Sequence, residues 1–189
     1  MKMLTQDRNR ILFEGFVLEP LSEQQYPLRF DCGDSDLNDF FRNDVLNHER
    51  QLFTKTYCLY EYNAELEAKS PLVGLISYSN DSVRIKDFKD HEEEIPEDKR
   101  YPNIPAVKIA RLAIQKDFQH LGIGSLLLNL TKLFFVTNNR TGCRLLTLDA
   151  YNDLRVLAFY MRSGFSFIHD KDKNRRNRIL FYDLSRTPV

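Results

Sequence analysis

The stretch Ala110–Leu128, ARLAIQKDFQHLGIGSLLL, decides which fold the sequence favours. It starts with small and branched apolar residues, typical of a buried strand, and ends in an apolar run whose spacing predicts a helix. Gly122 and Gly124 lie between the two, although glycine is a poor helix former. One explanation is a tight turn. The other is a backbone cradle for a phosphate, because free amides and the helix dipole attract anions to a helix start.

Two familiar phosphate-binding motifs are absent from this stretch. No GK[ST] follows the glycines, and position 127 is a leucine where the dinucleotide-binding pattern GxGxxG requires glycine. The glycine pair by itself therefore leaves both explanations open.

Length and composition predict an ordinary globular protein. The chain has 189 residues, and we expect one domain over residues 1–189. Lysine and arginine total 27, as do aspartate and glutamate, so no strongly basic nucleic-acid binder is indicated. No apolar run reaches the ~18 residues of a membrane helix, and the polar N-terminus does not resemble a secretory signal. Three cysteines without a CxxC pair, and only four histidines, indicate free thiols in the cytoplasm and no metal site.

The pattern of elements predicts a mixed α/β fold, with a mostly antiparallel sheet of about six to seven strands flanked by helices. Segment 81–103 fits a short helix and a loop. Asp34 or Ser35 is expected to cap the first helix, and Gly164 to end the last one. The expected strands are 10–21, 55–62, 72–80, 105–115, 144–151, 165–170 and 178–184, with a hairpin between the second and third, and the expected helices are 35–52, 123–138 and 152–163.

A second motif lies about 40 residues beyond the glycines, with one predicted strand between them. It is FYMRSGF, Phe159–Phe165. Together the two motifs resemble the GNAT superfamily of N-acetyltransferases, in which a strand, the pattern Q/R-x-x-G-x-G/A and a helix bind acetyl-CoA. In this sequence the pattern is Gln119–Gly124. The resemblance implies a single-domain GNAT-like fold and acetyl-CoA as the acetyl donor.

The resemblance also implies where acetyl-CoA binds. Backbone amides of residues 121–125 would hold the pyrophosphate, and the backbone of residues 112–114 would pair with the pantetheine arm like an added strand. An amide on this strand would also polarise the thioester carbonyl. The expected cofactor-binding residues are Leu112, Ala113, Ile114, Gln119, His120, Leu121, Gly122, Ile123, Gly124, Ser125 and Asn152.

Tyr160 occupies the position of the family's general acid. A phenol with an ordinary pKa of about 10 is protonated at neutral pH and can give its proton to a departing thiolate. The family has asparagine seven residues before this tyrosine, whereas this sequence has Asp153 there and Asn152 one residue earlier. Either Asn152 takes over the contact with the cofactor or the contact is lost. For the general base, Asp149, His48, Glu14, Glu61 and a chain of water molecules stay open.

The N-terminal half carries a further resemblance. FDCGDSDLNDFFRNDVLNHE, residues 30–49, followed by FTKTYCLY, resembles a GNAT subgroup that includes toxins acetylating aminoacyl-tRNA. That resemblance implies tRNA and a ribbon-helix-helix antitoxin as partners, and a structural cap at the helix start explains the motif equally well. Phosphate contacts would need basic residues, such as those of the turn 171–178 or Arg42, Arg50 and Lys55, although that turn also fits a solvated hairpin.

Three functions follow from these patterns. The first is an acetyltransferase that acts by direct attack of a primary amine in a ternary complex, on a small amine or a protein amine. The second is a toxin-type enzyme acting on aminoacyl-tRNA. The third is a non-catalytic CoA-binding module, suggested by Asp153. Family members are often dimers, so a homodimer stays open.

Overall fold

The computed structural model describes residues 3–7, 10–13, 15–26, 28–63, 65–88 and 102–188. They form two compact units, the first from residues 1–79 and 110–130 and the second from residues 80–109 and 131–189. No helix in these described ranges is long and apolar enough to cross a membrane. The strands are β1 Met3–Asp7, β2 Arg10–Phe13, β3 Phe16–Pro20, β4 Lys55–Asn63, β5 Ala68–Arg84, β6 Asn103–Ile114, β7 Leu145–Tyr151, β8 Ser166–Phe167 and β9 Asn177–Asp183, and the helices are α1 Ser35–Asp39, α2 Val45–Arg50, α3 Ile123–Val136 and α4 Leu154–Arg162.

The first unit contains an antiparallel run of strands in the order β1-β2-β3-β4-β5, with β6 beyond β5. The predicted hairpin between residues 55–62 and 72–80 is confirmed, because β4 pairs with β5. The predicted single strand 10–21 is wrong. The chain turns at Gly15, whose φ of +74° suits a glycine, and β2 and β3 form a hairpin on either side.

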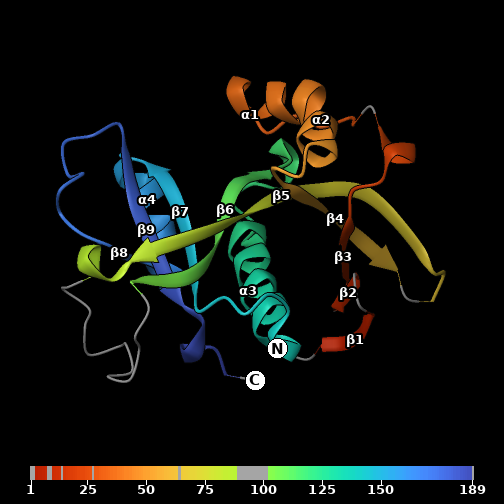
Figure 1. The fold of residues 1–189 in the computed structure, drawn as a ribbon. Helices are drawn as coiled ribbons and strands as arrows, with labels where there is room; N and C mark the ends of the chain where they lie inside the picture. Colours follow the sequence, from red (N-terminus) through yellow and green to blue (C-terminus); the bar gives the residue numbers. More distant parts are fainter. Residues whose placement is uncertain are drawn as a thin grey trace. The chain divides into compact units, whose positions relative to one another are not determined.

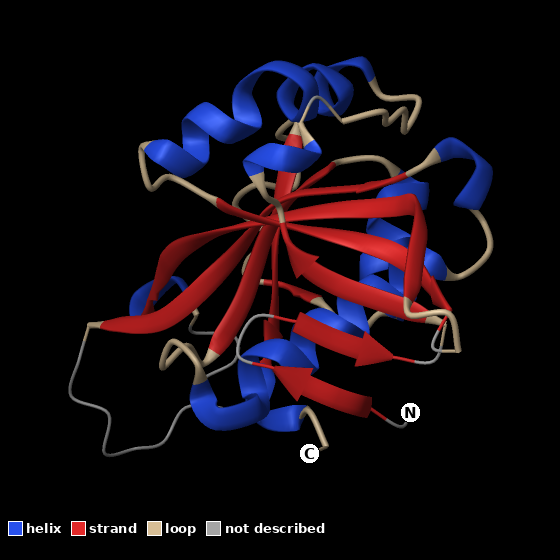
Figure 2. Cartoon of the chain, turned by 90° about the vertical axis from the view of Figure 1, so that its right-hand side faces the viewer, coloured by secondary structure: helices blue, strands red, loops and turns tan. Residues whose placement is uncertain are grey.

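One face of these strands is covered by α1 and α2, which a π-helical turn at Phe40–Asp44 joins (Figures 1 and 2). The predicted cap is confirmed, since a side-chain oxygen of Asp34 accepts a hydrogen bond from the Leu37 N–H at 3.0 Å. Phe41 and Val45 are fully buried and belong to one apolar cluster with Leu75 and Ala113 of the strands. Burial of this apolar face fixes the helical segment on the sheet.

The second unit has the strand order β6-β7-β9-β8. Its β6 and β7 are parallel, pairing over Ala106–Lys108 on the β6 side, whereas β9 is antiparallel to both β7 and β8. The apolar core of this unit contains Phe88 and Phe181, whose rings meet edge to face with centroids 4.6 Å apart. Gly164 follows α4 with a φ of +84°, which confirms the predicted glycine at its C-terminus.

The predicted mixed α/β fold with a largely antiparallel sheet is confirmed, with nine strands among the described residues rather than the predicted six to seven. The two extra strands are β1 and β3. The second arises because the predicted strand 10–21 is divided at Gly15 into β2 and β3. Most of segment 81–103 lies outside the described residues. Its described start continues β5 to Arg84 and ends in a short helical turn at Ile85–Asp87.

Candidate functional site

The glycine turn before α3 has an unusual backbone. His120 and Gly122 both have left-handed conformations, with φ values of +63° and +82°. A Cβ atom added to Gly122 would have nothing within 4 Å, so the backbone conformation, not crowding, requires glycine at this position. Alternation of left-handed and other residues turns successive N–H groups toward one side, which is the geometry of an anion-binding nest.

The start of α3 adds further free amides to this turn. Its first helical hydrogen bond is donated by the Leu126 N–H to the Gly122 carbonyl at 3.0 Å. The N–H groups of Ile123, Gly124 and Ser125 therefore precede the hydrogen-bonded ladder, at the positive end of the helix dipole. The predicted pyrophosphate residues 121–125 are thus brought together by the local chain, in a form that suits an anion.

The predicted pantetheine strand is the end of β6, Leu112–Ile114, in the same unit. Its inner neighbour is β5, which approaches closely at Gly74. A Cβ on Gly74 would lie 3.2 Å from the Ala113 carbonyl oxygen and 3.0 Å from the Ile114 side chain, so glycine permits this contact. The parallel register with β7 covers Ala106–Lys108, and Leu112–Ile114 follow that paired stretch along β6.

Gln119 joins this turn to the N-terminal motif. Its side-chain Nε2 donates to the Cys32 carbonyl at 2.7 Å and to the Ile114 carbonyl at 3.0 Å. Two more bonds link the same segments: the Asp31 N–H donates to the Gln115 side chain at 2.9 Å, and the Lys116 N–H donates to the Asp31 carbonyl at 2.9 Å. We call the two segments 31–33 and 115–119, held by these bonds, the clasp. Sequence reasoning missed it.

The N-terminal motif also forms a local network. Asp31 Oδ1 accepts from the Gly33 N–H at 2.8 Å and from the Asn38 side chain at 2.7 Å, and these bonds hold the pKa of Asp31 below its usual value. The Cys32 N–H donates to Asn38 Oδ1 at 2.9 Å. The conformation of residues 31–38 is therefore fixed by capping and turn bonds, as the structural explanation of the motif expects.

Replacing Gln119 by leucine should test whether this side chain supports the fold or contacts the cofactor. The change leaves the Cys32 and Ile114 carbonyls without their donor, and we expect the free energy of unfolding to fall by about 1–3 kcal/mol. Urea unfolding measures this loss, and titration of the folded variant measures acetyl-CoA affinity. An unchanged stability with a large loss of affinity would assign Gln119 to the cofactor instead.

Tyr160 lies on α4 in the second unit and is partly buried. Its ring meets those of Phe159 and Phe165 edge to face, with centroids 4.9 and 5.8 Å away. Burial raises the pKa of Tyr160 to about 12, so the phenol keeps its proton throughout the neutral range. The phenol is thus present in the form that can donate a proton, while its raised pKa makes it a weaker acid than an ordinary tyrosine.

Asn152 and Asp153 hold the start of α4. Both amide hydrogens of Asn152 go to the neighbouring turn, with Nδ2 donating to the carbonyls of Lys173 and Arg175 at 2.9 and 3.0 Å. Asp153 caps the helix, since its Oδ1 accepts from the N–H groups of the next helical residues at 2.9 and 3.2 Å. The aspartate at the family's asparagine position therefore has a structural role here. The contact of Asn152 with the cofactor stays a prediction.

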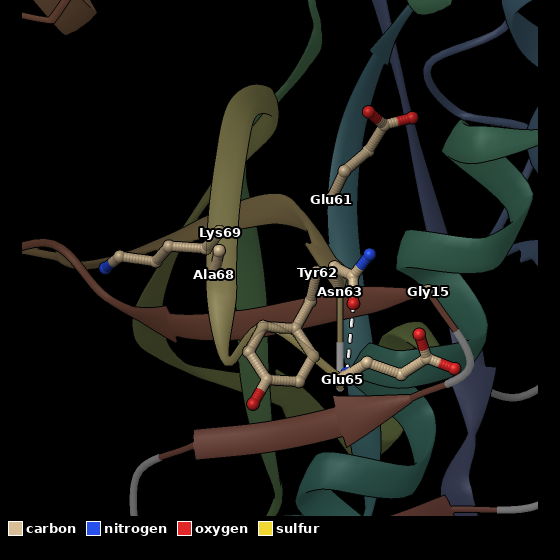
Figure 3. A pocket seen from close by; sticks show the side chains of 7 residues that line it. All are labelled: Gly15, Glu61, Tyr62, Asn63, Glu65, Ala68 and Lys69. Carbon is tan, nitrogen blue, oxygen red and sulfur yellow. Dashed lines mark hydrogen bonds between the residues drawn. The ribbon is translucent and has the colours of Figure 1, made fainter.

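The proposed bases are scattered among different environments. Asp149 pairs with Lys108 at 2.6 Å, and Glu14 lies outside the described residues. Glu61 lines an open hollow of about 650 Å³ at the end of the β4–β5 hairpin, where Figure 3 shows it pointing away from Glu65. None of the predicted cofactor residues lines this hollow; its walls are Gly15, Glu61, Tyr62, Asn63, Glu65, Ala68 and Lys69.

Many of the basic residues expected to contact phosphates are paired with acids. Arg178 is buried against Asp172 at 2.7 Å, and Lys171 pairs with Asp87 at 3.0 Å. Arg50 and Lys55 pair with Glu23 and Glu49 at 2.9 and 2.8 Å, and Arg42 donates to the Phe30 carbonyl at 2.8 Å. Lys173, Arg175 and Arg176 stay exposed on the turn, so its basic surface is smaller than the sequence suggests. Within the described residues no group of His, Cys, Asp and Glu could hold a metal ion.

No protein-family model and no curated protein matches the chain. Solved structures do. AtaT complexed with acetyl-methionyl-tRNAfMet is 24% identical with a TM-score of 0.72, over 90% of this chain and 95% of that one. AtaTR bound with AcCoA is 23% identical with a TM-score of 0.69, over 92% and 96%. A mutant of KacT is 24% identical with a TM-score of 0.71, over 90% and 96%. The chain therefore has the GNAT-type fold of the AtaT and KacT structures.

Proposed function

We propose that this chain is an acetyl-CoA-dependent N-acetyltransferase, with residues 1–189 acting as one catalytic domain in the cytoplasm. The observation that carries the proposal is the turn 120–125, in which two left-handed residues and the unpaired start of α3 present backbone amides together. The likeness to AtaTR bound with AcCoA supports the same cofactor.

The proposed mechanism uses residues from both sequence motifs. Acetyl-CoA supplies an activated acetyl group as a thioester. Amides of residues 121–125 bind the pyrophosphate, and the backbone of residues 112–114 binds the pantetheine arm and donates a hydrogen bond to the oxyanion that develops as the amine attacks. As the C–N bond forms and the C–S bond breaks, Tyr160 donates its proton to the departing sulfur. Because its pKa is raised to about 12, the phenol holds this proton through the neutral and mildly alkaline range. The proton that the amine loses passes to one of the candidate bases or to a chain of water molecules.

Thermal unfolding with acetyl-CoA tests the proposal. Saturating acetyl-CoA, at about 100 times its dissociation constant, should stabilise the wild-type chain by about 2.7 kcal/mol. Gly122→Glu places a carboxylate in the glycine turn and forces a non-glycine residue into a left-handed conformation, so it should abolish this stabilisation. Gly142→Glu is the matched control, because Gly142 also has a positive φ, of +64°, and open space around its Cβ position. No shift for the wild-type chain, or equal losses in the two variants, would contradict the proposal.

A second candidate acceptor is the amino group of aminoacyl-tRNA. It is favoured by the likeness to AtaT complexed with acetyl-methionyl-tRNAfMet and by the clasp, which ties the N-terminal motif to the cofactor turn. The partners are then tRNA and a ribbon-helix-helix antitoxin encoded by a neighbouring gene. Expression of the chain should arrest growth. Mass spectrometry of aminoacyl-tRNA from the same cells should show acetylated amino acids. Normal growth with unmodified aminoacyl-tRNA would leave a small amine or a protein amine as the acceptor.

A further inference from the structure

Arg111 is a partly buried cation without a carboxylate partner among the described residues. Its Nη1 donates to the Ala110 carbonyl at 2.8 Å, and its guanidinium lies over the Phe40 ring, 4.9 Å from the centroid. Its Nε is shielded from solvent and has no acceptor in the described part of the chain. Arg144 and Arg178, by contrast, each have a carboxylate at 2.7 Å. A shielded cation without a counter-ion is costly, so an anion at Arg111 would relieve that cost.

His48 lies against the same ring. Its imidazole meets Phe40 edge to face at 5.1 Å between centroids, and Phe53 packs on it at 5.8 Å. The Nδ1 of His48 is also shielded, with no hydrogen-bond partner in the described ranges. Phe53 is 60% exposed, so the group borders solvent. We call Phe40, His48, Phe53 and Arg111 the Arg111 cluster. It combines two unsatisfied polar groups with an aromatic wall.

The Arg111 cluster lies at the strand that the proposed mechanism uses. Arg111 directly precedes Leu112–Ile114 and, by the alternation of a strand, shares its face with Ala113. Ala113 packs in the apolar cluster with Phe40 and Phe41 beneath α1 and α2. A group held by Arg111 would therefore be within one or two residues of the backbone expected to carry the thioester.

We propose that the Arg111 cluster binds an oxyanion carried by the acceptor amine, either a phosphate or a carboxylate, and so determines which amines are acetylated. The assignment deepens the proposed function and rests on it. The guanidinium fork offers parallel N–H donors to two oxygens, and the aromatic rings of Phe40 and Phe53 contact the apolar part of the acceptor. Arg111 is thus a specificity-determining residue, distinct from the groups that bind the acetyl donor.

Direct binding of inorganic phosphate tests the cluster without any turnover. Isothermal titration should show that Arg111→Gln lowers the affinity for phosphate at this site by about tenfold or more, as expected for the loss of a hydrogen bond to a charged group. Any phosphate that binds at the glycine turn contributes equally to the two titrations, because the turn is identical in both proteins. Arg29→Gln, which removes an exposed arginine of the same unit, is the matched control and should bind as the wild type does. Equal binding by the wild type and Arg111→Gln would overturn the proposal.

Acceptor kinetics identify the source of the oxyanion. One pair compares an amino acid with its amide, and the other compares an aminoacyl-adenosine with and without a 5′-phosphate. In Arg111→Gln, KM for the anionic member of one pair should rise about 10- to 100-fold. Its kcat, and the KM for the neutral member of that pair, should change by less than about threefold. The affected pair distinguishes carboxylate from phosphate. Equal effects on both members of both pairs would overturn the assignment.

A conservative variant and the phosphate titration distinguish three outcomes: misfolding of Arg111→Gln, failure of the Arg111 assignment and failure of the proposed function. Arg111→Lys keeps the charge but loses the fork, so it should fold and show an intermediate rise in KM. If Arg111→Gln does not fold, the lysine variant decides the matter, and wild-type values in it would contradict recognition by the fork. If acetyl-CoA does not stabilise the wild-type chain and the chain acetylates none of these amines, the proposed function fails, whereas the phosphate titration still judges the Arg111 cluster.

Discussion

Tyr160→Phe is expected to lower kcat by about 10²- to 10⁴-fold, the usual contribution of a positioned general acid. The variant removes one hydroxyl and keeps the ring contacts with Phe159 and Phe165, so folding and acetyl-CoA affinity should stay close to wild type. Release of free CoA thiol, followed by its reaction with a disulfide dye, measures the rate. Tyr182→Phe is the control, since Tyr182 is also partly buried and in the same unit.

The pH dependence sharpens this test. Because burial raises the pKa of Tyr160 to about 12, the acid stays protonated well above the pH at which an ordinary tyrosine ionises. The wild-type kcat should therefore show no decline with an apparent pKa near 10. A decline at that pH that disappears in Tyr160→Phe would mean that the phenol titrates normally. Activity of Tyr160→Phe equal to the wild type would remove its assignment as the acid.

Of the variants proposed for stability measurements, Arg144→Met should show the largest fall in the free energy of unfolding. Asp183 is 2% exposed, and its two carboxylate oxygens accept from Arg144 Nε and Nη2 at 2.7 and 2.8 Å. Removing the arginine leaves a buried carboxylate that keeps hydrogen bonds from Ser185 alone among those named, its N–H at 2.9 Å and its side chain. We expect a fall of about 3 kcal/mol in the free energy of unfolding. Arg50→Met breaks an exposed pair and should cost less than about 1 kcal/mol. Similar losses in both variants would contradict this account.

The stabilisation at Asp183 should also depend on pH. Burial alone would raise the pKa of Asp183, but the hydrogen bonds from Arg144 and Ser185 outweigh it and lower the pKa. A lowered pKa in the folded state means that the stabilisation is complete above the unfolded value of about 3.9 and is lost as the pH falls through the folded value. Urea unfolding at pH 7, 5 and 3 should therefore show a stability difference between the wild type and Arg144→Met that shrinks as the pH falls and is smallest at pH 3.

Local patterns predicted the C-terminal half of the fold well. The apolar spacing from Ile123 onward gave α3 to within a few residues, and Gly164 marked the end of α4 because its left-handed conformation is rare for other residues. The N-terminal strands were harder. β1 is a polar segment, MLTQD, without strong strand propensity, and the alternation of β2 continues into β3 so that Gly15 was the sole indication of a turn.

The candidate site was predictable where it depends on neighbouring residues. The glycine turn is local, so spacing alone located it, and its left-handed residues explain why glycine occupies position 122. The contacts of Gln119 and Gln115 were not predictable, because their partners Cys32 and Asp31 are 87 and 84 residues away. The Arg111 cluster was hidden for the same reason. Nothing in the sequence indicates that Arg111 and His48 pack on one phenyl ring.

The clasp has a consequence for protein engineering. Segment 31–33 is hydrogen-bonded to segment 115–119. Helices α1 and α2, which follow the first segment, and the glycine turn, which follows the second, therefore share a common anchor. A chimera that imports only residues 30–50 from a homologue would replace half of this anchor and disturb the turn it supports. Exchanging both segments together keeps every bond between matched partners, so transfer of acceptor preference between homologues requires a two-part graft.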